Sequence, residues 1–181
     1  MDKKPQHIHI FFHHMQDCYK EIEKVADCPV EFHTEPPTEN FQCQKSSLII
    51  FDDLQGCKNT TEVIKDFFIR RSHHDDISVI YICQTLFDKH PAHRVISLNT
   101  NYFVIFNSPR DRSELSHLSK QIYPGANNFL SSVASTIVRE GGVRGTYLVI
   151  DLFPDTEESY RIRNTLFPAL DFPNAFAYVR Y

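Results

Sequence analysis

Seven short strand-like runs alternate along this chain with segments whose apolar residues recur at helical spacing. Three of the runs are nearly continuous apolar stretches, which is typical of strands that helices bury on both faces. The expected strands are residues 8–12, 30–33, 48–51, 77–83, 102–106, 147–150 and 175–179, and the expected helices are residues 17–26, 61–70, 112–122 and 128–139. This alternation predicts an α/β fold with a mostly parallel sheet flanked by helices.

Length and composition favour a single folded unit. With 181 residues, of which 41% are hydrophobic, the chain can bury one sizeable core, so we expect one domain over residues 1–181. The net charge of -4 gives no sequence-wide basic footprint, so contact with nucleic acid would need a local patch or a basic partner. No apolar run approaches the roughly 20 residues of a membrane-spanning helix, so we expect no membrane partner.

The cysteines indicate a reducing compartment. The five cysteines are odd in number, form no C-x-x-C motif and lie in or beside apolar segments. No secretory signal pattern precedes them, so we expect reduced thiols in a protein of the nucleus or the cytoplasm and not a secreted protein.

Two consecutive carboxylates, Asp52 and Asp53, end the apolar run of residues 47–51. In open α/β sheets, ligands bind at the carboxyl ends of the strands. One acid at such a position can hold Mg²⁺ through water while the second polarises an attacking water. The simpler interpretation is a strand that ends on solvated acids before a turn, because this short pattern is common.

The next apolar run, residues 77–83, is followed by Gln84. If the two strands are neighbours, the amide of Gln84 falls at the same edge of the sheet as the two acids, where it could hold a water or sense a phosphate. A glutamine is also an ordinary strand exit. The order of acid pair, helix, strand and glutamine is more specific than either piece alone.

A charged turn, residues 70–76, lies between the expected helix and that strand, and it begins with Arg70 and Arg71. Arginines placed there could reach the nucleotide of a neighbouring subunit as arginine fingers. The alternative is a solvated turn near a helix C-terminus, where cations are favourable in any case.

The histidines do not form a recognisable metal motif. His73 and His74 are adjacent in the turn, so their side chains diverge, whereas zinc sites use separated ligands. His7 and His9 share one face of a strand, but no cysteine or acid close in sequence completes a tetrahedral set, so we expect core or edge histidines. No G-x-S-x-G elbow occurs, which argues against a triad hydrolase.

Six segments taken in order resemble the genome-packaging ATPases of double-stranded DNA viruses and of Maverick/Polinton elements. These proteins belong to the FtsK/HerA branch of P-loop NTPases. The segments are residues 48–54 (LIIFDDL), 67–74 (FFIRRSHH), 77–87 (ISVIYICQTLF), 94–102 (RVISLNTNY), 106–111 (FNSPRD) and 121–125 (QIYPG). The resemblance extends over nearly the whole chain.

The resemblance implies catalytic roles for five residues. Asp52 and Asp53 match the Walker B acids of the family, with Asp52 holding Mg²⁺ through water, and Gln84 matches the polar sensor that ends the next strand. Arg70 or Arg71 falls where the family has a basic residue before the paired histidines, which implies a candidate arginine finger.

Two further segments match the family without an assigned chemical role. Asn99 and Asn101 lie in its Ser-Leu-Asn segment, and Pro109, Arg110 and Asp111 match a turn that serves either a subunit interface or the fold alone. Members of the family form rings that use Mg-ATP to translocate DNA. The resemblance therefore implies a homo- or hetero-oligomer, and double-stranded DNA as a partner.

The chain departs from the family at its amino-terminal side. The first strand of the family, its G-x-x-x-x-G-K-[ST] phosphate loop and the following helix should precede His7, and only six residues do. Lys3 and Lys4 are no substitute, because phosphates are cradled by backbone N–H groups at a helix N-terminus. We expect a sheet of the P-loop NTPase type that is truncated there, with apolar surface exposed where the first strand would pair.

The sequence thus predicts the carboxyl-terminal part of a viral-type, ATP-dependent DNA packaging or translocation ATPase. We do not expect this chain alone to bind Mg-ATP or hydrolyse ATP, and a viral origin would place it in a viral factory or virion. One alternative is a catalytically inactive, element-derived interaction module that assembles with other subunits. A third is an unrelated small α/β binding protein in which Asp52 and Asp53 only end a strand.

Overall fold

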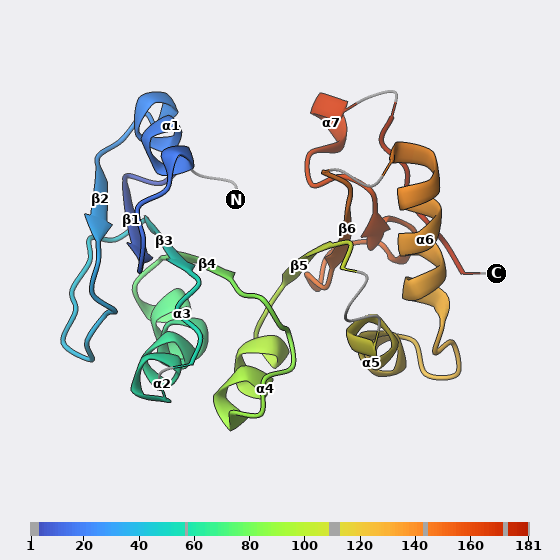
Figure 1. The fold of residues 1–181 in the computed structure, drawn as a ribbon, viewed down its shortest axis with the longest axis horizontal. Helices are drawn as coiled ribbons and strands as arrows, with labels where there is room; N and C mark the ends of the chain where they lie inside the picture. The colour runs from blue at the N-terminus through green and yellow to red at the C-terminus, as the bar shows by residue number, and fades with distance from the viewer. Residues whose placement is uncertain (1–3, 57, 109–112, 143–144, 172–173, 181) are drawn as a thin grey trace. The chain divides into compact units, whose positions relative to one another are not determined.

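The computed structural model describes residues 4–56, 58–108, 113–142, 145–171 and 174–180 (Figure 1). The chain forms two compact units, unit 1 over Met1–Asn99 and unit 2 over Thr100–Tyr181, and each is described by itself. Whether the two units act together as the single expected domain stays a prediction. No described helix has both the length and the apolar character needed to cross a membrane.

Unit 1 is a parallel four-stranded sheet with helices on its faces (Figure 1). The strand order is β2-β1-β3-β4, so β2 and β4 are the edge strands of this sheet. The strands are β1 (His7–Phe12), β2 (Val30–His33), β3 (Ser47–Asp52) and β4 (Ser78–Ile82). The helices are α1 (Asp17–Val25), α2 (Lys58–Asp66) continued by a π-helical turn (Phe67–Arg71), α3 (Ser72–His74) and α4 (Pro91–Leu98). The expected α/β fold with a parallel, helix-flanked sheet is therefore confirmed for unit 1.

The strands β1 and β3 are apolar on both sides because both faces of the sheet are covered. One buried cluster joins the two central strands to Ile64 of α2 and Ile96 of α4. A second cluster, on alternate strand residues, joins them to Tyr19 of α1. Period-two alternation of side chains places these two sets on opposite faces. The end of β3 is therefore fixed by packing from above and below.

Helix α4 was not expected from the sequence. Pro91 begins it, a position where the missing N–H of proline costs nothing, and His90 Nδ1 accepts a hydrogen bond of 3.3 Å from the backbone N–H of Ala92. The signals for this helix were thus a proline and a capping side chain rather than a long apolar period.

Unit 2 is built on an antiparallel sheet of order β5-β6-β7. Its strands are β5 (Tyr102–Phe106), β6 (Tyr147–Asp151) and β7 (Ile162–Arg163), and its helices are α5 (Ser113–Ile122), α6 (Phe129–Gly141), a 3₁₀ turn (Glu158–Tyr160) and α7 (Pro168–Asp171). Two expectations are corrected here. The strand expected at 175–179 is only an isolated bridge between Arg163 and Ala177, and the mostly parallel sheet does not extend to this unit. Alternation of strands and helices does not fix strand direction, and β6 returns to β7 through a short connection that favours antiparallel pairing.

Candidate functional site

The two consecutive acids lie where β3 ends. Asp52 is the last residue of the strand and pairs in register with Ile82 of β4, and the backbone N–H of Asp53 donates to the carbonyl oxygen of Ile82 at 3.1 Å. Asp53 has a φ of 52°, in the left-handed region, so the chain turns sharply between the two residues. As a result Asp52 is buried, at 9% exposure, while Asp53 is exposed.

Gln84 lies beside the acids at the same edge. Its side-chain Nε2 donates a hydrogen bond of 2.9 Å to Asp53 Oδ1. Gln55, which follows the acids in sequence, holds the segment after β4 in place: its Oε1 accepts from the Gln84 backbone N–H at 2.8 Å, and its Nε2 donates to the Thr85 carbonyl oxygen at 3.0 Å. The structure therefore brings the acid pair and the glutamine together across two neighbouring strands.

The side chain of Asp52 faces helix α1. The hydroxyl of Tyr19 on α1 donates a hydrogen bond of 2.6 Å to Asp52 Oδ2, and the Gln16 amide lies 3.4 Å from the same oxygen. Burial, followed by this hydrogen bond and the charge of Asp52, raises the pKa of Tyr19 well above its ordinary value. Tyr19 thus remains a hydrogen-bond donor over the whole neutral range.

Sequence reasoning missed Tyr19, Gln16 and Gln55. Tyr19 and Gln16 are more than 30 residues from Asp52 along the chain, and only the parallel pairing of β1 with β3 brings them near. Gln55 carried a weak signal, because it lies two residues after the acid pair and its amide can reach the end of the next strand.

The two arginines lie away from these acids. Helix α2 starts after the carboxyl end of β3 and its π-helical continuation ends before the amino end of β4, so Arg70 and Arg71 lie at the amino edge of the sheet. Arg70 is exposed and pairs with Asp66. Arg71 is held by Asp75 at 3.1 Å and lies over the ring of Phe67, 4.2 Å from its centroid. The structure does not join either arginine to Asp52, Asp53 or Gln84 within unit 1.

The remaining family matches have structural contacts or lie outside the described residues. The side chain of Asn99 donates to the Val95 carbonyl oxygen at 2.8 Å at the end of α4, and the Asn101 carbonyl oxygen accepts from the Leu152 N–H at 2.7 Å. Pro109, Arg110 and Asp111 lie outside the described residues.

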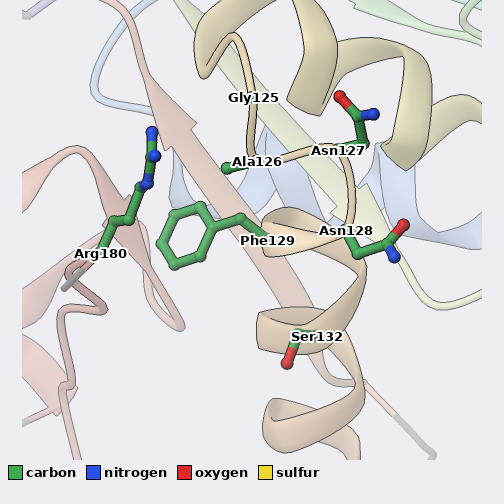
Figure 2. A pocket seen from close by; sticks show the side chains of 7 residues that line it. All are labelled: Gly125, Ala126, Asn127, Asn128, Phe129, Ser132 and Arg180. Carbon is green, nitrogen blue, oxygen red and sulfur yellow. The ribbon is translucent and has the colours of Figure 1, made fainter.

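The described part of unit 2 has a shallow hollow (Figure 2). It has a volume of about 530 Å³ and lies at the start of α6, where the ring of Phe129 points toward Arg180 while the amides of Asn127 and Asn128 point away from it. Arg180 is the charged side chain among its lining residues. Because no group there pairs a nucleophile with a base, the carboxyl edge of the unit 1 sheet remains the better candidate.

The carboxyl edge offers a donor set for a hard cation. Carboxylate and amide oxygens are the groups that Mg²⁺ prefers, and Mg²⁺ commonly keeps most of its water shell. Exposed Asp53 and largely buried Asp52 could contact such an ion through its water shell. Comparisons of the chain with family models, with curated proteins and with solved structures found no match. The assignment of a function therefore depends on the geometry of this edge.

Proposed function

We propose that unit 1 is the magnesium- and water-handling half of an ATPase site, in the carboxyl-terminal part of a DNA packaging or translocation ATPase of the FtsK/HerA branch. The observation that supports this proposal is the hydrogen bond between Gln84 and Asp53 at the carboxyl edge of a parallel sheet. An acid pair alone is a common strand ending, whereas an acid pair in which one acid is bonded to an amide that follows the next strand is a specific arrangement.

Each residue has a distinct role in this proposal. Mg²⁺, when bound with ATP, would neutralise charge on the transferring phosphoryl group. Asp52, which accepts the hydrogen bond of the Tyr19 hydroxyl, binds a water of the metal shell. Asp53 accepts a hydrogen bond from the attacking water through its exposed carboxylate, and Gln84 fixes the orientation of that carboxylate.

The other half of the proposed site comes from outside the printed sequence. The chain contains no G-x-x-x-x-G-K-[ST] loop, and cradling a triphosphate requires backbone N–H groups of that kind. In the proposed ring, Arg70, whose exposed side chain pairs with Asp66, reaches a neighbouring subunit, whereas Arg71 is held within its own unit by Asp75 and Phe67. Double-stranded DNA in the central channel is the proposed substrate of translocation.

The test measures ATP hydrolysis when a phosphate loop is supplied. The in-frame DNA upstream of Met1 is inspected for a strand, phosphate loop and helix, and the longer protein is expressed and assayed for Mg²⁺-dependent phosphate release. We expect Asp53→Asn to lower kcat by about 100-fold or more, as for loss of a general base. Asp27→Asn is the matched control, because Asp27 is an exposed acid paired with Lys4.

Two outcomes contradict the proposal. One is that the longer protein hydrolyses ATP and that its Asp53→Asn variant keeps a kcat within twofold of the parent. The other is the absence of a phosphate-loop segment in the in-frame DNA upstream of Met1.

A second candidate function is an inactive interaction module, which the edge strand β4 favours. Ile80 and Ile82 on this strand are 45% and 50% exposed, and exposed β-branched residues on the edge strand of a sheet favour addition of another strand. The proposed occupant is an apolar strand of a full-length ATPase subunit. This candidate predicts that the chain binds no ATP. It also predicts that the chain co-purifies with such a subunit and that Ile80→Lys abolishes this co-purification. Co-purification unchanged by Ile80→Lys would contradict it.

A further inference from the structure

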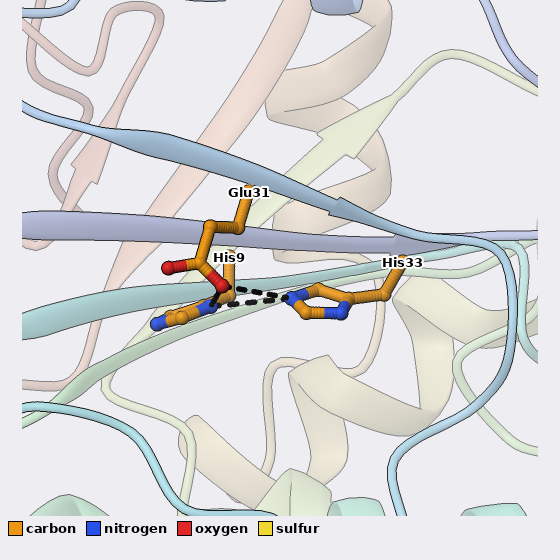
Figure 3. Close-up of side chains that lie close together, drawn as sticks. All are labelled: His9, Glu31 and His33. Carbon is orange, nitrogen blue, oxygen red and sulfur yellow. Dashed lines mark hydrogen bonds and ion pairs between the residues drawn. The ribbon is translucent and has the colours of Figure 1, made fainter.

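On one face of the unit 1 sheet, three side chains that do not belong to the acid-pair site converge (Figure 3). His9 lies on β1, and Glu31 and His33 lie on β2, with His9 in register with Glu31. Because alternate residues of a strand point to the same side, Glu31 and His33 share the face of His9. The sequence expectation concerned only residues close to His9 along the chain, whereas Glu31 comes from the adjacent strand.

We propose that His9, Glu31 and His33 bind one divalent transition metal ion of the Zn²⁺ class. This inference is independent of the ATPase proposal. The ligand atoms are one imidazole nitrogen from each histidine and one oxygen of Glu31, which is the two-histidine, one-carboxylate donor set of open zinc sites.

The distances among the three ligand atoms fit a zinc ion. His9 Nδ1 lies 3.2 Å from His33 Nε2 and 3.5 Å from Glu31 Oε2, and His33 Nε2 lies 4.0 Å from the same oxygen. A triangle with sides of 3.2, 3.5 and 4.0 Å has a circumscribed circle of radius about 2.1 Å, which matches Zn–N and Zn–O bond lengths. Closing the longest side by about 0.6 Å would give the roughly 3.4 Å separations of a tetrahedral site.

The second ring nitrogen of His9 has the partner expected of a metal ligand. His9 Nε2 lies 3.2 Å from Gln44 Oε1, and an amide oxygen can only accept, so the proton of neutral His9 lies on Nε2. The lone pair of His9 is then on Nδ1, which faces Glu31 and His33. Metal-bound histidines almost always donate their other N–H in this way, which fixes the orientation of the ring.

Aromatic rings pack against the two histidines of the site, while its Glu31 side is open to solvent. Phe11 stacks on His33 with centroids 4.4 Å apart, and Phe41 meets His9 edge-on at 5.4 Å. His9 is 2% exposed, whereas the side chain of Glu31 is 50% exposed. Water can therefore reach the site from the side of Glu31 and supply a fourth ligand. A bound ion would tie β1 to β2.

The experiment titrates untagged, chelator-treated protein with Zn²⁺ by calorimetry and with Co²⁺ by visible absorption. We expect one site per chain, with the Co²⁺ spectrum of a four-coordinate nitrogen and oxygen site. Glu31→Gln and His33→Ala should each weaken the binding of Zn²⁺ at least 10-fold. Glu31→Gln changes a half-exposed side chain, so it tests the site without disturbing the core.

Controls separate this site from surface histidines. His73→Gln and Glu21→Gln alter exposed residues elsewhere in unit 1 and should leave the affinity within twofold. Gln44→Ala should weaken binding about 10-fold, with recovery in Gln44→Glu, because Gln44 only positions His9. The proposal is overturned by the absence of one-to-one binding, or by binding that Glu31→Gln and His33→Ala leave unchanged.

Discussion

Gln84 Nε2 donates a hydrogen bond of 2.9 Å to Asp53 Oδ1, and this bond joins the residues that follow two neighbouring parallel strands. Asp53 reaches Gln84 because its backbone turns through a left-handed conformation directly after β3. The same turn leaves Asp52 under α1, in contact with Tyr19. Two acids adjacent in sequence thus have different surroundings, one buried and one exposed.

The left-handed backbone of Asp53 predicts a difference between two substitutions. Asp53→Asn should change the free energy of unfolding by less than about 0.5 kcal/mol, because asparagine tolerates this conformation. Asp53→Val should lower it by about 1–2 kcal/mol, since a β-branched residue is strained there. Urea denaturation of both variants measures the difference. Asp27→Val, at an exposed position without positive φ, is the control, and an equal loss in Asp27→Val would contradict the assignment of strain.

Tyr19→Phe should destabilise the protein by about 1.5–3 kcal/mol, because it removes a short hydrogen bond to the buried carboxylate of Asp52. Tyr160→Phe removes the hydroxyl of a largely exposed ring and should be nearly neutral. Chemical denaturation of Tyr19→Phe, Asp52→Asn and the double variant gives the coupling energy of the pair. A coupling near zero would show that the contact contributes nothing to stability.

Unit 2 contains a buried ion pair between Asp151 Oδ2 and Arg163 Nη1, 3.0 Å apart. Asp151→Asn should lower the stability of this unit by about 3–5 kcal/mol, because the guanidinium is left without its buried partner. Removing both charges in Asp151→Asn with Arg163→Met should be less costly than removing one. Glu158→Gln, at an exposed acid that pairs with Arg161, is the control. A double variant less stable than the single one would argue against this explanation.

His93 on α4 predicts a loss of stability at acid pH. Burial lowers its pKa below the ordinary value of 6.5, more than the opposing charge of Asp88 raises it. The unfolded chain then takes up the proton more readily, so the stability present above pH 6.5 is lost as pH falls through the folded-state pKa. Urea midpoints at pH 8 and pH 5 should differ less in His93→Gln than in the parent. Exposed His74→Gln should keep the parental difference, and an unchanged difference in His93→Gln would contradict the prediction.

The sequence predicted the strands of unit 1 because buried parallel strands are apolar on both faces. Residues 48–51 and 77–83 were expected as strands, and the structure has Ser47–Asp52 and Ser78–Ile82. The proximity of Gln84 to the acids was expected only on condition that these strands were neighbours. The register of β3 with β4 meets that condition. The sequence gives no comparable indication of strand direction in unit 2, because β5 and β6 are apolar segments that could pair in parallel or antiparallel.

The sequence alone determined the apolar periodicities, and with them the β1–β3 core, the helices α1 and α2 that cover it and the place of Asp52 and Asp53 at a strand end. Those features depend on local spacing and burial, which each segment encodes in itself. Only the tertiary structure decided that Tyr19 contacts Asp52 and that Glu31 and His33 meet His9. Contacts of this kind depend on strand order and register, which are set by the packing of the whole unit and are not encoded in any single segment.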